Sequence, residues 1–116
     1  MSHTNPNFMT GTITLNNLTA SSGEHLETTG AVESAEIVTN QNNNILLKLT
    51  IHDLDEEMLF FSSVVDSNVD ENSGYITVTV QTVQDLTTFF IQIKNHNVSS
   101  NADITLSCFF AKNYLQ

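Results

Sequence analysis

The sequence predicts an all-β fold, a single antiparallel β-sandwich of about seven strands, either immunoglobulin-like or jelly-roll in topology. Seven short segments alternate apolar and polar side chains with a period of two residues, and polar, turn-forming segments separate them. No segment has the apolar period of a long amphipathic helix, which argues against βαβ units. The length of 116 residues corresponds to one domain. Periodicity does not choose between the two topologies.

The N-terminal half is expected to contain an arm followed by four strands. Residues 1–10 hold the only proline, Pro6, and we expect them to form an extended arm that either frays or docks on a neighbouring subunit through Phe8. The single domain is expected to span residues 11–116. Two polar stretches are interpreted as a long loop at 16–30 and a surface hairpin loop at 40–44. The predicted strands are 11–15, 31–39, 45–51 and 58–65.

Three further strands are expected at 75–81, 89–94 and 104–110. The first two are predicted to form a hairpin about Gln84-Asp85, because this turn places both apolar rows on one face. The predicted register sets Val80 opposite Phe89, Val78 opposite Ile91 and Ile76 opposite Ile93. The third strand repeats the alternation, and its apolar row includes the only cysteine, Cys108, which we expect to be buried rather than nucleophilic.

Six of the seven phenylalanines occur as adjacent pairs, at 60–61, 89–90 and 109–110. Neighbours in a strand point to opposite faces, so each pair sends one ring inward and one outward. If Phe89 lies opposite Phe110, Phe90 lies opposite Phe109, with Tyr75 further along the same face. Such a cluster predicts a contact surface. The interface candidates are therefore Phe90, Phe109, Tyr75 and Phe8, and the alternative is that loops or the arm cover these rings within the monomer.

Charge excludes several classes of partner. The chain carries 3 basic and 13 acidic residues, a net charge of −10. Binding to nucleic acid requires lysine and arginine to neutralise phosphates, so neither nucleic acid nor an anionic membrane is an expected partner. No apolar run is long enough to cross a bilayer, and the N-terminal residues lack the pattern of a signal peptide. We therefore expect synthesis in a cytoplasm.

The sequence contains no recognisable catalytic or cofactor motif. Residues 66–74 place Asp66, Asn68 and Asp70 at the spacing that opens an EF-hand loop, but Glu71 and Thr77 stand where that loop needs glycine and glutamate. A solvated turn is the expected structure there, with calcium binding as the alternative. The four histidines have no metal-ligand spacing. We expect no metal, no cofactor and no enzymatic activity.

The C-terminal third resembles a known class of module. A Thr/Val strand and a hairpin precede Thr-Thr-Phe-Phe-Ile-Gln-Ile-Lys-Asn (87–95) and Ser-Ser-Asn-Ala-Asp-Ile-Thr-Leu (99–106). This pattern is similar to the final strands of small β-sandwich modules in bacteriophage virion proteins, including head decoration (cement) proteins and receptor-binding fibre or H-type-lectin-like domains. The resemblance implies a non-enzymatic structural protein that is repeated on a particle surface, often as a trimer.

Two functions follow as expectations. The first is a virion component, a homo-oligomer that joins a larger assembly such as a capsid or tail and whose acidic, arginine-free exterior suits the outside of a capsid. The second is a carbohydrate-binding or adhesin module, because sugar sites combine exposed aromatic rings with amide and carboxylate groups. We expect the loops 40–44, 66–74 and 95–103 to supply these polar groups.

Overall fold

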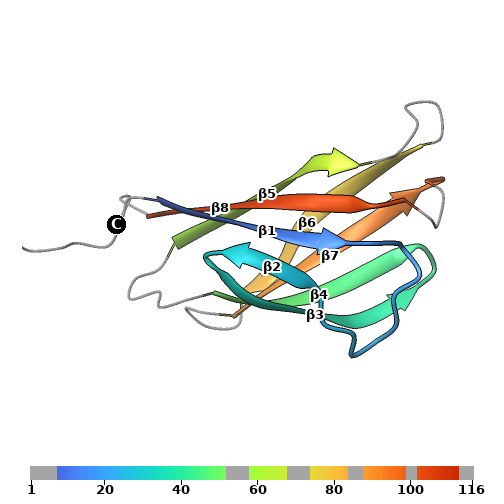
Figure 1. Cartoon of the computed structure of the whole chain (residues 1–116), viewed down its shortest axis with the longest axis horizontal. Helices are drawn as coiled ribbons and strands as arrows, with labels where there is room; N and C mark the ends of the chain where they lie inside the picture. The colour runs from blue at the N-terminus through green and yellow to red at the C-terminus, as the bar shows by residue number, and fades with distance from the viewer. Residues whose placement is uncertain (1–7, 52–57, 68–73, 84–87, 99–101, 113–116) are drawn as a thin grey trace, which may run out of the picture.

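The computed structural model describes residues 8–51, 58–67, 74–83, 88–98 and 102–112 (Figure 1). Side chains are described for 9–51, 74–80, 88–98 and 102–110, and elsewhere in these ranges only the backbone is described. The described residues form strands, turns and loops, which confirms the predicted all-β class. The strands are β1 (Phe8–Leu15), β2 (Glu27–Gly30), β3 (Val32–Gln41), β4 (Asn44–Ile51), β5 (Met58–Ser67), β6 (Tyr75–Val83), β7 (Thr88–His96) and β8 (Ile104–Lys112).

Eight strands form two antiparallel sheets of four. The first sheet, sheet A, has the order β2-β1-β8-β5, and the second, sheet B, has the order β3-β4-β7-β6. The sheets lie one over the other as a sandwich (Figure 1). All seven predicted segments contain a strand. The N-terminal strand begins at Phe8, so residues 8–10 of the expected arm belong to β1, while residues 1–7 lie outside the described part.

The eighth strand, β2, lies inside the segment that was expected to be a loop. It pairs with β1 from Gly11↔Gly30 to Thr14↔Glu27. Its four residues are all partly or fully exposed, so no apolar alternation marks it in the sequence. The chain leaves β2 through Gly30, whose φ of +64° favours glycine and where a Cβ atom would collide with the carbonyl oxygen of Thr10.

The segment before β2 runs beside β3 and bonds to its backbone. Gly23 N donates to Ile37 O at 2.7 Å, Ile37 N donates to Glu24 O at 2.9 Å, and Leu26 N donates to Ala35 O at 2.9 Å. The β3 edge of sheet B is therefore partnered by the chain itself. The side-chain amide of Asn40, also on β3, donates to Leu18 O and Ala20 O, at 3.0 and 2.7 Å, and so adds two further hydrogen bonds to the same loop.

The hairpin predicted at 40–44 is confirmed, and its turn is shorter than the predicted loop. Asn42 and Asn43 alone form the turn, with φ of 55° and 65°, while Gln41 pairs with Asn44. Positive φ at both central residues defines a type I′ turn, whose twist matches that of the flanking strands. Asparagine tolerates this conformation better than other non-glycine residues, which explains the asparagine run.

The predicted β6–β7 hairpin forms, but its register differs from the prediction. Val80 pairs with Ile91 instead of Phe89, and Val78 pairs with Ile93. A shift by two residues keeps every side chain on its face, so the alternation alone cannot detect it. A β-bulge between Val80 and Thr82 then changes the offset of the remaining pairs. The turn at Gln84-Asp85 lies outside the described residues.

The core lies between the sheets and is built from the apolar rows that the alternation predicts. Across β4, β7 and β8 these rows are at most 3% exposed: Ile45, Leu47, Leu49, Ile51, Phe89, Ile91, Ile93, Ile104, Leu106, Cys108 and Phe110. The predicted burial of Cys108 is confirmed, and desolvation raises the pKa of its thiol from 9.0 to about 12. A thiol that stays protonated at neutral pH is a poor nucleophile.

Candidate contact surfaces

The predicted aromatic cluster does not form, because β7 and β8 lie in different sheets. Phe89 and Phe110 face each other across the core, with ring centroids 5.8 Å apart and planes tilted by 59°. Their neighbours Phe90 and Phe109 therefore point out of opposite sides of the sandwich. The expectation that Phe90 lies opposite Phe109 in a neighbouring strand is wrong, and the protein presents two outer faces instead of one aromatic surface.

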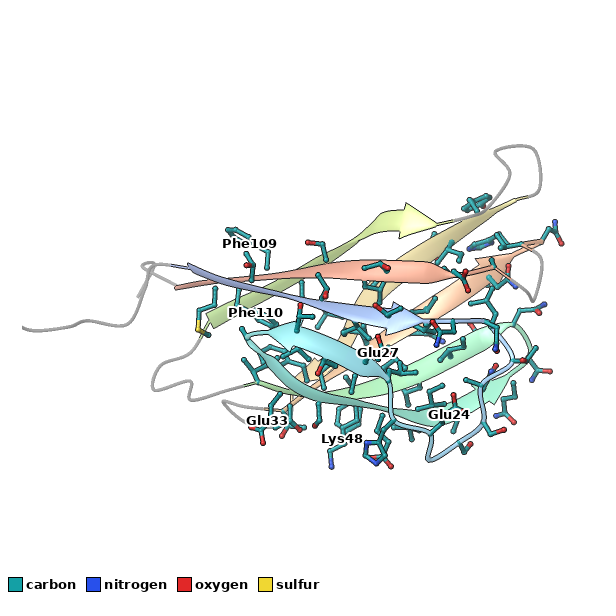
Figure 2. The ribbon with its side chains drawn as sticks, in the orientation of Figure 1. Glu24, Glu27, Glu33, Lys48, Phe109 and Phe110 are labelled. Atoms are coloured by element: carbon teal, nitrogen blue, oxygen red, sulfur yellow. The ribbon has the colours of Figure 1, made fainter. Side chains whose placement is uncertain are left out.

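Phe109 lies on the outer face of sheet A. Its side chain is 38% exposed, and its register partners are Thr10 on β1 and Phe61 on β5. Figure 2 shows Phe109 pointing away from the core, while the adjacent Phe110 points into it. Among the described side chains of this face, Phe109 is the one large apolar group with an exposed surface.

The rest of the described outer face of sheet A consists mainly of hydroxyl side chains. The hydroxyls of Thr12 and Thr29 lie 2.6 Å apart and hydrogen-bond to each other, and Thr12 N donates to the same Thr29 oxygen. Thr14, Thr105 and Ser107 continue the row and are partly buried. The described side chains of β1 and β8 on this face carry no charge, and the one described carboxylate of the face is Glu27 on β2, the register partner of Thr14.

Phe90 and Tyr75 lie on the outer face of sheet B. Phe90 is half-buried, and its register partners are Lys48 and Thr82. Tyr75 is 61% exposed and stacks on His96, with ring centroids 4.2 Å apart and planes 10° from parallel. His96 Nε2 also lies 3.2 Å from Thr77 Oγ1. The stack fixes the Tyr75 ring at the first residue of an edge strand.

Phe8, the fourth interface candidate, is the first residue of β1 and pairs with Ala111. Its side chain lies outside the described residues. Of the three candidates whose side chains are described, Phe109 lies on one outer face, and Phe90 and Tyr75 lie on the other.

A shallow polar groove crosses the outer face of sheet B near the β3–β4 turn. It encloses about 280 Å³, and Gln92 Nε2 donates to Asn44 Oδ1 across it at 3.3 Å. Amide and hydroxyl groups dominate its lining, which consists of Thr39, Gln41, Asn42, Asn44, Leu46 and Gln92. Sequence reasoning placed some of these residues in a polar loop but missed the groove, because β7 contributes Gln92 from the far half of the chain.

A second hollow of about 230 Å³ lies beside the loop that leads into β2. It brings Glu24, His25 and Glu27 near Asn16 and Asn17, a grouping that spacing along the chain did not predict. Among the described residues, no three His, Cys, Asp or Glu side chains lie close enough to hold a metal ion. Most of the loop considered for calcium, residues 68–73, lies outside the described part.

Comparison with known proteins adds no assignment. No family model, curated protein or solved structure matches this chain. No helix in the described part of the chain is long and apolar enough to cross a membrane.

Proposed function

We propose that the protein is a non-enzymatic structural component of a virion surface, a capsid decoration (cement) protein or a related particle component. The observation that carries the proposal is the position of Phe109, a large ring 38% exposed on an outer face where the other described side chains of β1 and β8 carry hydroxyl groups. Such a face can exclude water on contact without burying unpaired charge, as the centre of a protein interface requires.

The two-sided arrangement supports a repeated component. Phe109 marks one outer face and Tyr75 the other, so a single copy offers apolar contacts in two opposite directions. A subunit with different contact surfaces on opposite sides can touch two neighbours at once, which is how extended and closed arrays are built. The net charge of −10 opposes nonspecific aggregation of the copies and disfavours contact with packaged nucleic acid.

The test is reconstitution on particles. Purified protein is added to particles of the encoding virus that lack it, and the bound protein is quantified after sedimentation. We expect saturable binding with a fixed number of copies per particle. Phe109→Ser should weaken binding at least tenfold, because a central aromatic anchor is worth roughly 2 kcal/mol or more, while its melting temperature stays close to that of the wild type.

A matched control replaces a neighbour on the same face. Thr10→Ser keeps a hydroxyl at an exposed position that pairs with Phe109 across β1 and β8, and it should leave binding unchanged. The proposal fails if the wild type shows no saturable binding, or if Phe109→Ser binds particles as tightly as the wild type.

The groove on sheet B favours a second candidate, a carbohydrate-binding or adhesin module. Its amide and hydroxyl lining matches the donors and acceptors of a sugar, and Tyr75 offers an exposed ring on the same face. Binding to a glycan array that is lost in Gln92→Ala, a groove residue, would establish this function. An array without a signal would exclude the glycans it carries.

A further inference from the structure

The outer edge of β6 differs from the three other sheet edges of this molecule. The edge strands are β2 and β5 in sheet A and β3 and β6 in sheet B. Acidic side chains occur in three of them, namely Glu27 in β2, Glu33 and Glu36 in β3, and Asp66 in β5. β6 has the sequence Tyr-Ile-Thr-Val-Thr-Val-Gln-Thr-Val and carries no charge, proline or glycine.

Natural sheets protect their edges with charges, bulges or covering segments, because an open edge pairs readily with another strand. The segment 23–26 covers the β3 edge through the three backbone hydrogen bonds described above. Within the described residues, β6 pairs only with β7. Its one protective feature in the described part of the chain is the bulge between Val80 and Thr82, which leaves the stretch from Tyr75 to Val80 regular.

The inward row of β6 is also less buried than the rows of the central strands. The inward row of β6 consists of Ile76 and Val78, which are partly buried, and Val80, which is 38% exposed. The register partners of Val78 and Val80 on β7, Ile93 and Ile91, are at most 1% exposed. The apolar layer therefore continues to the edge strand, where Val80 keeps part of its surface exposed. A strand added beside β6 would extend the layer and bury more of this row.

We propose that the strand added at this edge is β6 of a second copy of the chain. Antiparallel pairing about a two-fold axis at Val78 would set Ile76 against the partner's Val80, so that the two apolar rows meet on the inner face. On the outer face, Thr77 would meet the partner's Thr79, and cross-strand threonine pairs are favourable. The regular stretch is thus complementary to itself, as an isologous interface requires.

Charge argues for the same partner. A chain with a net charge of −10 repels its own copies over most of its surface. β6 is the one edge where two copies meet without opposing acidic side chains, and the neighbouring Lys94 on β7, the register partner of Thr77, adds positive charge nearby. This inference goes beyond the proposed function, since it uses the edge of sheet B and not the faces marked by Phe109 and Tyr75.

The test uses two double variants and their mixture, with the mass in solution measured by light scattering over a range of concentrations. The wild type should be a dimer that dissociates on dilution. In T77E/T79E and in T77K/T79K, residue 77 and the partner's residue 79 carry like charges. Each variant alone should therefore be monomeric at concentrations where the wild type is dimeric. We expect the dissociation constant of the dimer to rise roughly tenfold or more. The 1:1 mixture places Glu opposite Lys and should restore the dimer.

The control places the same charges on the opposite edge of the same sheet. T39E/Q41E changes two exposed residues of β3 with the same spacing and should dimerise like the wild type. Thr77 and Thr79 are exposed, so the variants should remain folded, which circular dichroism checks. A wild type that is monomeric at every concentration, or double variants that dimerise like the wild type, would overturn the proposal.

A cysteine test fixes the register and does not depend on the charged variants. The two-fold axis brings Val78 beside the partner's Val78, within the distance a disulfide spans, while the two copies of Val80 lie several residues apart. Mild oxidation should therefore cross-link V78C and not V80C. Equal cross-linking of both, or of neither, would contradict the pairing about Val78. These measurements need no particles, so their failure is distinct from failure of the proposed virion role.

Discussion

The assignment of β7 and β8 to different sheets can be tested by measuring which phenylalanines interact energetically. Phe89 and Phe110 are at most 1% exposed, and their ring centroids lie 5.8 Å apart across the core. Aromatic pairs in this range and tilt interact by about 0.5–1.5 kcal/mol beyond the burial of each ring. Phe90 and Phe109 point out of opposite sheets. Since packed sheets are about 10 Å apart, these two rings should not interact.

The perturbations are Phe→Leu substitutions combined in two double-mutant cycles. Leucine keeps most of the apolar volume, so F89L and F110L should each lower the free energy of unfolding by about 1–3 kcal/mol. A domain of this size is expected to be stable by about 5–15 kcal/mol, so the double variant should still fold. The F89L/F110L cycle should give a coupling energy of about 0.5–1.5 kcal/mol. The F90L/F109L cycle should be additive to within about 0.5 kcal/mol.

Urea unfolding followed by circular dichroism measures these free energies, at concentrations below those at which the protein self-associates. The slope against urea should stay constant across the variants, which shows that the same transition is compared. Coupling between Phe90 and Phe109 would refute the reasoning, because it requires the two rings to touch, as they would if β7 and β8 were neighbours in one sheet. Strict additivity of Phe89 and Phe110 would equally contradict their contact.

Three further predictions concern the thiol, a glycine and a loop anchor. Burial raises the pKa of the Cys108 thiol in the folded chain to about 12, against 9.0 for an ordinary thiol. Below pH 9.0 the thiol is protonated in both the folded and the unfolded chain, so stability does not depend on its titration there. Above that pH the unfolded chain loses the proton first, so stability should fall by about 1.4 kcal/mol per pH unit until the folded pKa is reached, and urea unfolding of wild type and C108A across pH should show the difference. Gly74 has φ of +116°, and a Cβ atom there would collide with a backbone carbonyl oxygen. Gly23 has φ of +86°, and a Cβ atom there would meet open space. Thermal unfolding should therefore show G74A destabilised by more than about 3 kcal/mol and G23A by only about 1–2 kcal/mol. N40A removes both hydrogen bonds from the Asn40 amide to the loop before β2 and should lower the free energy of unfolding by roughly 1–3 kcal/mol in urea.

Alternation in the sequence predicts faces well, because the direction of each Cβ depends only on local backbone geometry. The inward row Ile45, Leu47, Leu49 and Ile51 is buried as predicted. Cys108 is buried for the same reason: it lies in phase with its apolar neighbours. Alternation does not predict the strand β2, because all four of its residues are polar or small and none is buried. It is held by pairing with β1, which is information from elsewhere in the chain.

Pairing between strands is what alternation cannot supply. A hairpin shifted by two residues keeps both apolar rows on one face, so Val80 can meet Ile91 instead of Phe89 without any loss of phase. Likewise, two strands adjacent in sequence carry the same pattern whether they lie side by side or across the core. The same limit applies to the predicted aromatic surface. Alternation predicts that Phe109 points outward, but its separation from Phe90 follows only from the sheet to which each strand belongs.

The positions of the charged residues indicate which sheet edge can pair with another strand, but only when the strand order is known. In the sequence, the charge-free segment 75–83 reads simply as a strand with good β propensity, like several others in this chain. The order β3-β4-β7-β6 places that segment at an edge, where the absence of charge is unusual and favours pairing with another strand. The acidic residues of β2, β3 and β5 lie at the three other edges, where they oppose such pairing. From this distribution of charge we expect strand-to-strand association at the β6 edge, which would leave the faces marked by Phe109 and Tyr75 available for other neighbours.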